Sequence, residues 1–296
     1  MKSKIALLVV YNHRYDKNIP LIEKIYGSRF SHIYHLVPFY DGESQYNVIP
    51  VYESSYYFQG YIAQAYGYLK EDEFTHYYVI ADDLILNPVI NETNLWDVTG
   101  LKIDECLLPE FIVLQKSSEF WSQAAKALKW SAGYPGLEAK VLPSREEALR
   151  KFEKFNMPDG PVSSGILGIK ENIWRKLFNR NHANKIENRT LHYPLVGGYS
   201  DTFLITSDAM RIFANYCGFF ATTRLFVEFA VPTAMVLSAD KIKLEKDIKF
   251  TGWPIWNKEQ IEGFEEQYHS DLIYLMNNFP HNVLYIHPIK LSKWKI

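Results

Sequence analysis

The hydrophobic and polar positions of the first third of the chain alternate between strand-like and helix-like spacing. Four apolar segments have the length of strands: 5–10, 30–39, 48–52 and 77–81. Residues 58–69 carry apolar positions at helical spacing, and a further helix is expected at 16–26. The order β-α-β-β-α-β predicts an α/β sheet, in which ligands gather at the carboxyl ends of the strands.

The pattern in the rest of the chain is less regular. The elements expected there are strands at 101–114, 160–169 and 199–205 and helices at 119–129, 145–155 and 208–216. Segment 130–161 carries a charged amphipathic helix flanked by prolines and is interpreted as an insertion or lid. Segment 225–235 is apolar except for one acidic residue, Glu228.

Length and composition fit a globular α/β protein. The 296 residues are 47% hydrophobic, which is ample for a sizeable core, and the net charge of −2 gives no general field to attract nucleic acid. The N-terminus runs straight into a strand, no apolar segment approaches the ~20 residues needed to span a bilayer, and the two cysteines lack CxxC spacing. We therefore expect a cytoplasmic protein without a transmembrane segment. Peripheral contact with the inner face of the membrane stays open, as does the oligomeric state.

Two adjacent carboxylates, Asp82 and Asp83, end the apolar run 77–81. Burying an ionised carboxylate without a partner is very costly, so the pair needs a cation, strong donors or water. A divalent metal is the sharpest interpretation. Asn12 and Asp41 follow two other predicted strands and are expected at the same edge of the sheet.

Several sequence features resemble GT-A-type glycosyltransferases. They are the polar cluster after the first strand, Ala81-Asp82-Asp83, Ser164-Gly165-Ile166, the acidic residue in 225–235, and a late His-Pro-x-Lys at 287–290. The resemblance covers the chain in order but is one of pattern, and it singles out no particular family. It implies one domain over 1–296, with a mixed, mostly parallel sheet flanked by helices. A Rossmann-like nucleotide-sugar-binding half would span 1–100, and an acceptor-binding half 101–296.

The resemblance also implies a metal site. In such enzymes a D-x-D motif holds Mn²⁺ or Mg²⁺ against the diphosphate of the donor, and here Ala81 replaces its first acid. By this likeness Asp83 and His287 are the metal ligands, Asp82 lies near the ribose or a metal-bound water, and Lys290 binds phosphate. The alternatives are a hydrogen-bonded histidine at a strand end and a solvated lysine.

The donor and the acceptor have further candidate contacts. Tyr11 and Asn12, at the end of the first strand, are expected beside the base and ribose, with Asp41 at the same edge. Trp253 and Trp256 are expected to approach the acceptor, because aromatic faces pack on sugars. Aromatic residues of this kind are also common in cores.

Glu228 and Asp201 are the candidate catalytic bases. An inverting transfer needs a carboxylate to take the proton from the acceptor hydroxyl, and an acid among apolar residues should have a raised pKa. The alternatives are that Glu228 pairs with Arg224 on an exposed helix turn and that Asp201 caps a turn.

The function that follows is transfer of a sugar from a nucleotide-diphosphate donor to a hydroxyl of a glycan or glycolipid, with inversion favoured over retention. The family-level role is synthesis of bacterial-type surface glycan, such as lipopolysaccharide, capsule or O-antigen. A sugar-nucleotide pyrophosphorylase is the second candidate, although the loop 11–16 lacks the glycines of its phosphate loop. The third is a non-catalytic nucleotide- or glycan-binding module.

Overall fold

A seven-stranded mixed sheet forms the centre of the computed structural model, which describes residues 4–70, 74–116, 122–137, 139–160 and 191–295. Its strand order is β3-β2-β1-β4-β7-β6-β8. The strands are β1 (Ile5–Val10), β2 (His32–Pro38), β3 (Val48–Val51), β4 (His76–Ala81), β6 (Cys106–Leu108), β7 (Thr202–Thr206) and β8 (Ile242–Leu244). All run parallel except β7, which pairs antiparallel with both β4 and β6.

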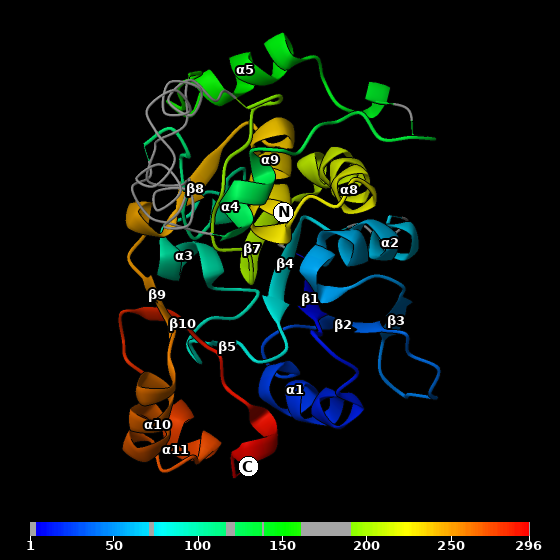
Figure 1. The fold of residues 1–296 in the computed structure, drawn as a ribbon. Coiled ribbons are helices and arrows are strands. Elements are labelled where there is room, and N and C mark those ends of the chain that lie inside the picture. The colour runs from blue at the N-terminus through cyan, green and yellow to red at the C-terminus, as the bar shows by residue number, and fades with distance from the viewer. Residues whose placement is uncertain (1–3, 71–73, 117–121, 138, 161–190, 296) are drawn as a thin grey trace, which may run out of the picture.

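Helices cover both faces of this sheet (Figure 1). One face carries α2 (Gln59–Leu69), α8 (Ser207–Thr222) and α9 (Val227–Ser238), and the other carries α1 (Ile19–Tyr26). The other α-helices among the described residues are α3 (Leu95–Thr99), α4 (Ser122–Ala127), α5 (Arg145–Glu153), α10 (Lys258–Gln267) and α11 (Leu272–Asn277). The fold is therefore α/β and Rossmann-like, as the sequence predicts.

Every residue of β1 is buried, because the sheet has a hydrophobic core on each side. Alternate residues point to opposite faces of a strand. Ala6, Leu8 and Val10 accordingly join the core under α2, α8 and α9, whereas the residues between them join the core that includes α1. This two-sided burial explains why the strand is a continuous apolar run rather than an alternating one.

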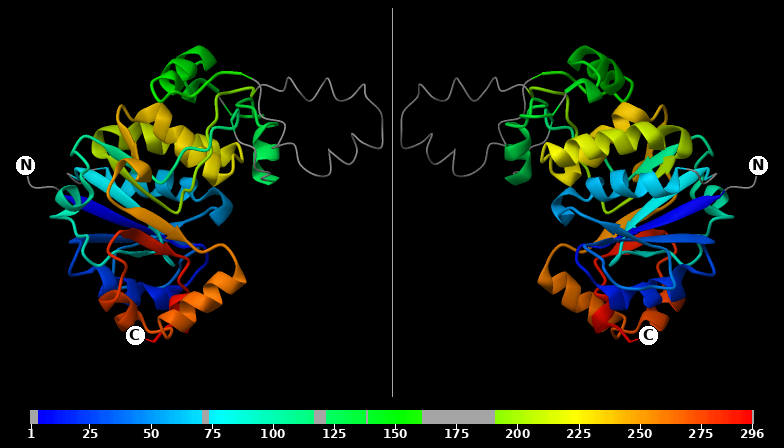
Figure 2. Two further views of the ribbon diagram at one scale, coloured as in Figure 1. Left: turned by 90° about the vertical axis from the view of Figure 1, so that its left-hand side faces the viewer. Right: turned by 90° about the vertical axis from the view of Figure 1, so that its right-hand side faces the viewer.

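A second, three-stranded sheet brings the C-terminal part of the chain to the end of β4. It consists of β5 (Ile85–Leu86), β10 (Val283–His287) and β9 (Thr251–Pro254), in the order β5-β10-β9. In the antiparallel pair of β10 and β5, Tyr285 lies opposite Leu86 and Ile286 opposite Ile85. Figure 2 shows this part of the chain beneath the main sheet, on the side of α1.

The order β-α-β-β-α-β is confirmed by β1, α1, β2, β3, α2 and β4. The strand expected at 101–114 is confined to β6, and segment 225–235 forms most of α9. The described part of the expected insertion at 130–161 holds α5 and a short 3-10 helix. The strand expected at 160–169, with Ser164-Gly165-Ile166, lies outside the described residues apart from Gly160. Among the helices described, none is long and apolar enough to cross a membrane.

Candidate functional site

The chain turns at Asp82 and Asp83, immediately after β4, and the Leu84 amide donates to the Ala81 carbonyl at 3.1 Å. Successive residues of a straight strand point to opposite faces, so only a turn can bring both carboxylates to one edge. The two side chains nevertheless have different partners. Asp82 is directed into the core and is 2% exposed, whereas Asp83 meets the C-terminal strand.

Asp82 is held by donors from the first βα segment. Its Oδ2 accepts a hydrogen bond of 3.0 Å from Nδ2 of Asn18, which is itself buried, and the backbone N–H of Asn12 also donates to the carboxylate. Burial, followed by repulsion from Asp83, raises the pKa of Asp82 to about 7, and these donors act against the rise. Asp82 is therefore anchored in place.

Asp83 and His287 meet although 204 positions separate them. Their Oδ1 and Nε2 atoms lie 2.9 Å apart, and Nδ1 of His287 lies 2.5 Å from the Tyr199 hydroxyl. Pairing of β10 with β5 delivers His287 to this place, and the Ile289 amide binds the Asp83 carbonyl at 2.6 Å. Burial lowers the pKa of His287, but the hydrogen bond and charge of Asp83 outweigh it, so the pKa is raised.

Tyr199 connects this pair to an aromatic group. Its ring stacks on Tyr285 with centroids 5.9 Å apart and meets the edge of Trp256, which is 70% exposed. A Cβ on Gly252 would lie 2.3 Å from the Tyr285 ring, so only glycine lets β9 pass this close. These aromatic contacts thus hold the Tyr199 ring in place, and its hydroxyl contacts Nδ1 of His287, on the side of the imidazole away from Asp83.

Asp201 lies beside the end of β4, opposite Ala81. The register continues from the pair Ile80 and Thr202, and the Ala81 amide donates to the Asp201 carbonyl at 2.8 Å. Directly opposed residues of antiparallel strands place their side chains on the same face. Burial raises the pKa of Asp201; the positive charge of His287 opposes the rise, and Asp83 adds to it. A carboxylate therefore stands near the position where Ala81 lacks one.

Glu228, in the first turn of α9, faces other acidic groups. Burial, then Asp201 and Glu110, raise its pKa to about 7. Among the described residues, none donates a hydrogen bond to its side chain, which is partly exposed. Gly198 positions this helix end: its amide donates to the Glu228 carbonyl at 2.9 Å, and a Cβ there would lie 2.5 Å from the Glu110 carbonyl oxygen.

Arg224 does not pair with Glu228. Its guanidinium binds Glu53 at 2.7 Å and lies over the Tyr57 ring. The alternative in which Glu228 is neutralised by Arg224 is therefore wrong.

The other sequence candidates are spread more widely. Tyr11 is fully buried and its hydroxyl lies 2.8 Å from His35, so its ring does not face a ligand. Asp41 is exposed and ion-paired with Arg14 at 2.5 Å. Lys290 is exposed, and Trp253 packs edge to face on Phe264 in α10. Asn12 approaches the site through its backbone.

Two participants were missed by the sequence reasoning. Tyr199 stands two residues before Asp201 in a turn that the sequence marks by Gly197 and Gly198, so that turn was the available signal. Asn18 carries no comparable signal, because only the fold of the loop after β1 brings it to Asp82.

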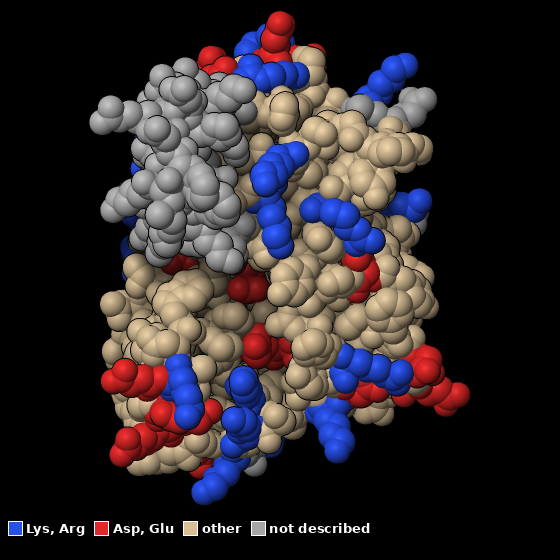
Figure 3. Space-filling model, viewed as in Figure 1, with Lys and Arg blue, Asp and Glu red and all other residues tan. Residues whose placement is uncertain are grey.

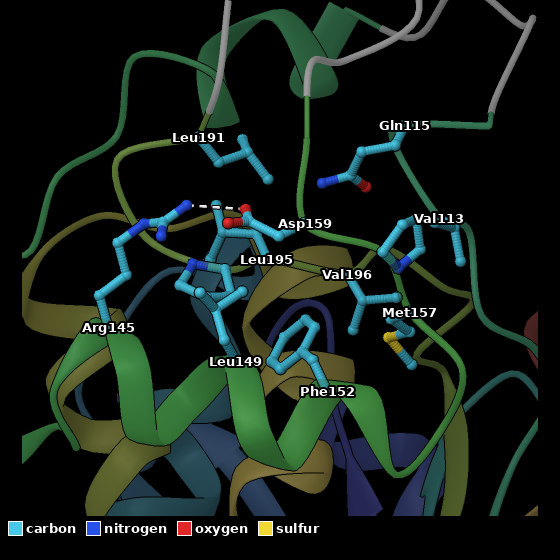
Figure 4. A pocket seen from close by; sticks show the side chains of 12 residues that line it. Val113, Gln115, Arg145, Leu149, Phe152, Met157, Asp159, Leu191, Leu195 and Val196 are labelled. Atoms are coloured by element: carbon cyan, nitrogen blue, oxygen red, sulfur yellow. Dashed lines mark hydrogen bonds and ion pairs between the residues drawn. The ribbon is translucent and has the colours of Figure 1, made fainter.

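Acidic side chains lie recessed at the centre of the face where β1, β2 and β4 end (Figure 3). A separate cavity between α5 and residues 191–196 is mostly apolar, with the ion pair of Arg145 and Asp159 at its edge (Figure 4). Its volume of about 10 Å³ barely admits one water molecule. This cavity is therefore too small for a ligand-binding site.

Among the described residues, no group of three or more His, Cys, Asp or Glu side chains could by itself hold a metal ion. The pair Asp83 and His287 would fit two neighbouring ligands of one cation, which would replace the hydrogen bond between them. In an octahedral shell with bonds near 2.1 Å, adjacent ligand atoms lie about 3 Å apart, and the observed separation is 2.9 Å. Mg²⁺ is often held by one or two carboxylates, with waters and substrate phosphates completing the shell.

No protein-family model matches this chain, and no curated protein matches it. Function is therefore inferred from the residues and their geometry.

Proposed function

We propose that this protein is a GT-A-type glycosyltransferase that moves a sugar from a nucleotide-diphosphate donor to a hydroxyl of a glycan or glycolipid. One observation carries the proposal: the β4 turn, the β7 start, the α9 start and β10 bring Asp83, Asp201, Glu228 and His287 into one electrostatic group at the edge where ligands bind in α/β sheets. A role in bacterial-type surface glycan synthesis follows only from the family resemblance.

Asp83 and His287 would hold the divalent cation, Mn²⁺ or Mg²⁺. When bound, the cation offsets charge on the diphosphate leaving group as a Lewis acid. For His287 to offer its Nε2 lone pair, the proton must be on Nδ1, from which it donates a hydrogen bond to the hydroxyl oxygen of Tyr199. Tyr199 therefore orients the imidazole, and Asp82 keeps the turn in place through Asn18.

Glu228 is the general base in this proposal. The acceptor oxygen forms a bond to the anomeric carbon as the bond to the diphosphate breaks, and the carboxylate takes the hydroxyl proton. A base works best when its pKa lies near the working pH, and that of Glu228 is raised to about 7. With no hydrogen bond from a described residue, its oxygens are available to an acceptor. Asp201 raises that pKa and is the competing base.

The direct test is thermal unfolding with a panel of nucleoside diphosphates, with and without Mn²⁺. We expect one nucleotide to raise Tm only when the metal is present, because a ligand that binds the folded state stabilises it. His287→Ala and Asp83→Asn should abolish this rise. His281→Ala is the matched control, since His281 is exposed on the loop that precedes β10.

The same experiment separates the alternatives. A flat panel would overturn the proposal in favour of a module that does not bind nucleotides. Stabilisation by a nucleoside triphosphate together with a sugar 1-phosphate, and by no diphosphate, would instead indicate a pyrophosphorylase. If binding is observed, transfer of radiolabelled sugar to a glycan acceptor distinguishes an enzyme from a binding module.

A further inference from the structure

An aromatic and basic cavity adjoins the start of α9, outside the acidic centre. It lies between the 3-10 helix Ser55–Tyr57, α4 and the turn that joins α8 to α9, and its volume is about 160 Å³. One water molecule needs about 10–15 Å³ of such a cavity. The cavity therefore has room for several waters or for one ring-sized group.

Its walls are aromatic and held in place by contacts within the protein. The aromatic residues that line it are Tyr56, Tyr57, Trp130 and Phe226. The rings of Tyr56 and Phe226 lie 5.8 Å apart, and the Trp130 indole N–H donates to the Thr223 carbonyl at 3.1 Å. Tyr56 is 59% exposed. Such partly exposed rings are suited to packing against the apolar face of a sugar.

Two lysines on the same wall carry positive charge that no described residue balances. Lys126 and Lys129 line the cavity, are exposed, and form no ion pair with any described residue. The charge of Arg224, which also lines it, is already matched by Glu53 at 2.7 Å. Figure 3 shows basic side chains beside the acidic hollow. A lysine is a compact point charge that binds carboxylate or phosphate.

The cavity is joined to the candidate base by one short segment. Phe226 precedes the first residue of α9, and Glu228 is in the first turn of that helix. Two residues of backbone span at most about 7 Å. Away from a bound cation the acidic side chains repel anions, so an anionic group of the acceptor needs a separate, positively charged place close to the reacting hydroxyl.

We infer that this cavity is an acceptor subsite for an acidic sugar, with the ring packed on Tyr56 and Phe226 and its carboxylate or phosphate bound by Lys126 and Lys129. The role of this cavity as an acceptor site rests on the proposed function, whereas its binding of an acidic sugar does not. The subsite would select acceptors by charge, whereas the donor would be selected at the end of β4.

Binding can be tested without nucleotide or metal, by saturation-transfer NMR titration of the full chain. The probes are methyl β-glucuronide and methyl β-glucoside, which differ only at C6, where the first has a carboxylate and the second a hydroxymethyl group, and glucose 6-phosphate. We expect the glucuronide, the phosphate or both to bind at least fivefold more tightly than the glucoside. Preference for one acid identifies the anionic group. Equal binding of all three probes, or binding of none, would overturn the inference.

The variant K126Q/K129Q should weaken binding of the acidic sugar about tenfold and leave the glucoside unchanged, because each exposed ion pair contributes modestly. K246Q/K249Q is the matched control: it removes two exposed lysines at the same spacing, away from the cavity. Tyr56→Ala should weaken the binding of both the acidic sugar and the glucoside, whereas Tyr56→Phe should weaken the binding of neither. Unchanged binding of the acidic sugar in K126Q/K129Q would overturn the charge assignment.

A membrane surface is the competing occupant. If vesicles of phosphatidylglycerol and phosphatidylcholine sediment the parent chain but not K126Q/K129Q, and no acidic sugar binds, the inference is overturned in favour of lipid. Because these assays omit nucleotide and metal, their outcome is independent of the nucleotide test. An acidic-sugar site can stand if that test fails, and it can fail if that test succeeds.

Discussion

Asp82, at the end of β4, and Glu228, at the start of α9, have similar raised pKa values of about 7 in different surroundings. Asp82 is fully buried and accepts a hydrogen bond from Asn18. Glu228 is partly exposed, has acidic neighbours and receives no hydrogen bond from a described residue. A raised pKa alone therefore does not identify a base. Exposure and free lone pairs do, since a base must reach the proton it removes.

Replacing each carboxylate by its amide tests this contrast with the largest expected effect. Glu228→Gln should lower the rate of transfer by about 100-fold or more, the usual contribution of a general base. Nucleotide binding with Mn²⁺ should not change. Asp82→Asn keeps an oxygen that can accept the hydrogen bond from Asn18. We therefore expect weaker binding of the nucleotide sugar, but a much smaller loss in the rate of transfer from the bound nucleotide sugar. Steady-state transfer kinetics separate the two.

Full transfer activity in Glu228→Gln would contradict the assignment. If Asp201→Asn were then inactive, the base would be Asp201. If both variants transferred sugar normally, a retaining mechanism, which needs no such base, would be favoured.

The pH dependence of transfer should report Glu228. Its pKa is raised to about 7, and only the ionised form can accept a proton. We therefore expect the rate to rise about tenfold per pH unit below pH 7 and to level off above it. Saturating Mn²⁺ keeps metal binding at His287 from limiting the rate. In Glu228→Gln the residual rate should lose this slope; a flat profile in the parent chain would oppose Glu228 as the base.

Removing the side chain of Asn18, which donates a hydrogen bond to Asp82, should destabilise the fold. The pKa of Asp82 is raised above that of the unfolded chain, so its contribution to stability falls as pH rises from about 4 to 7. Asn18→Ala removes a hydrogen bond that favours the ionised form, so the pKa of Asp82 should rise further and the fall in stability should extend to higher pH. We expect a loss of about 1–3 kcal/mol in the free energy of unfolding at pH 8 and less at pH 5, measured by urea denaturation.

Asn87→Ala is the control for that measurement. Asn87 is also buried, but its amide donates to the carbonyls of Pro280 and Val283, which do not titrate. The decrease in the free energy of unfolding caused by Asn87→Ala should therefore not depend on pH. If the decrease caused by Asn18→Ala were equally independent of pH, then Asn18 would not stabilise the ionised form of Asp82.

The sequence predicts the first half of the fold well because β1 and β4 are buried on both faces and read as continuous apolar runs. It also predicts that Asp82 and Asp83 follow directly after one of these strands, at its carboxyl end. It could not predict that Asp82 and Asp83 would diverge, because that depends on a turn whose partners, Asn18 and His287, come from distant segments. Nor could it distinguish the partner of Arg224, since Glu53 is 171 positions away.

Arg224→Gln should have the smallest effect. It tests whether the pKa of Glu228 is independent of the arginine nearest to it in the sequence. Arg224 is half-exposed and bound to Glu53, and exposed ion pairs contribute about 0.2–1 kcal/mol. Burial, Asp201 and Glu110 raise the pKa of Glu228, and Arg224 does not act to lower it. The unfolding free energy should therefore fall slightly, and the midpoint of the pH profile for transfer should stay in place. A midpoint that moved upward in this variant would mean that Arg224 stabilises ionised Glu228, and the contrast with the donor-anchored Asp82 would disappear.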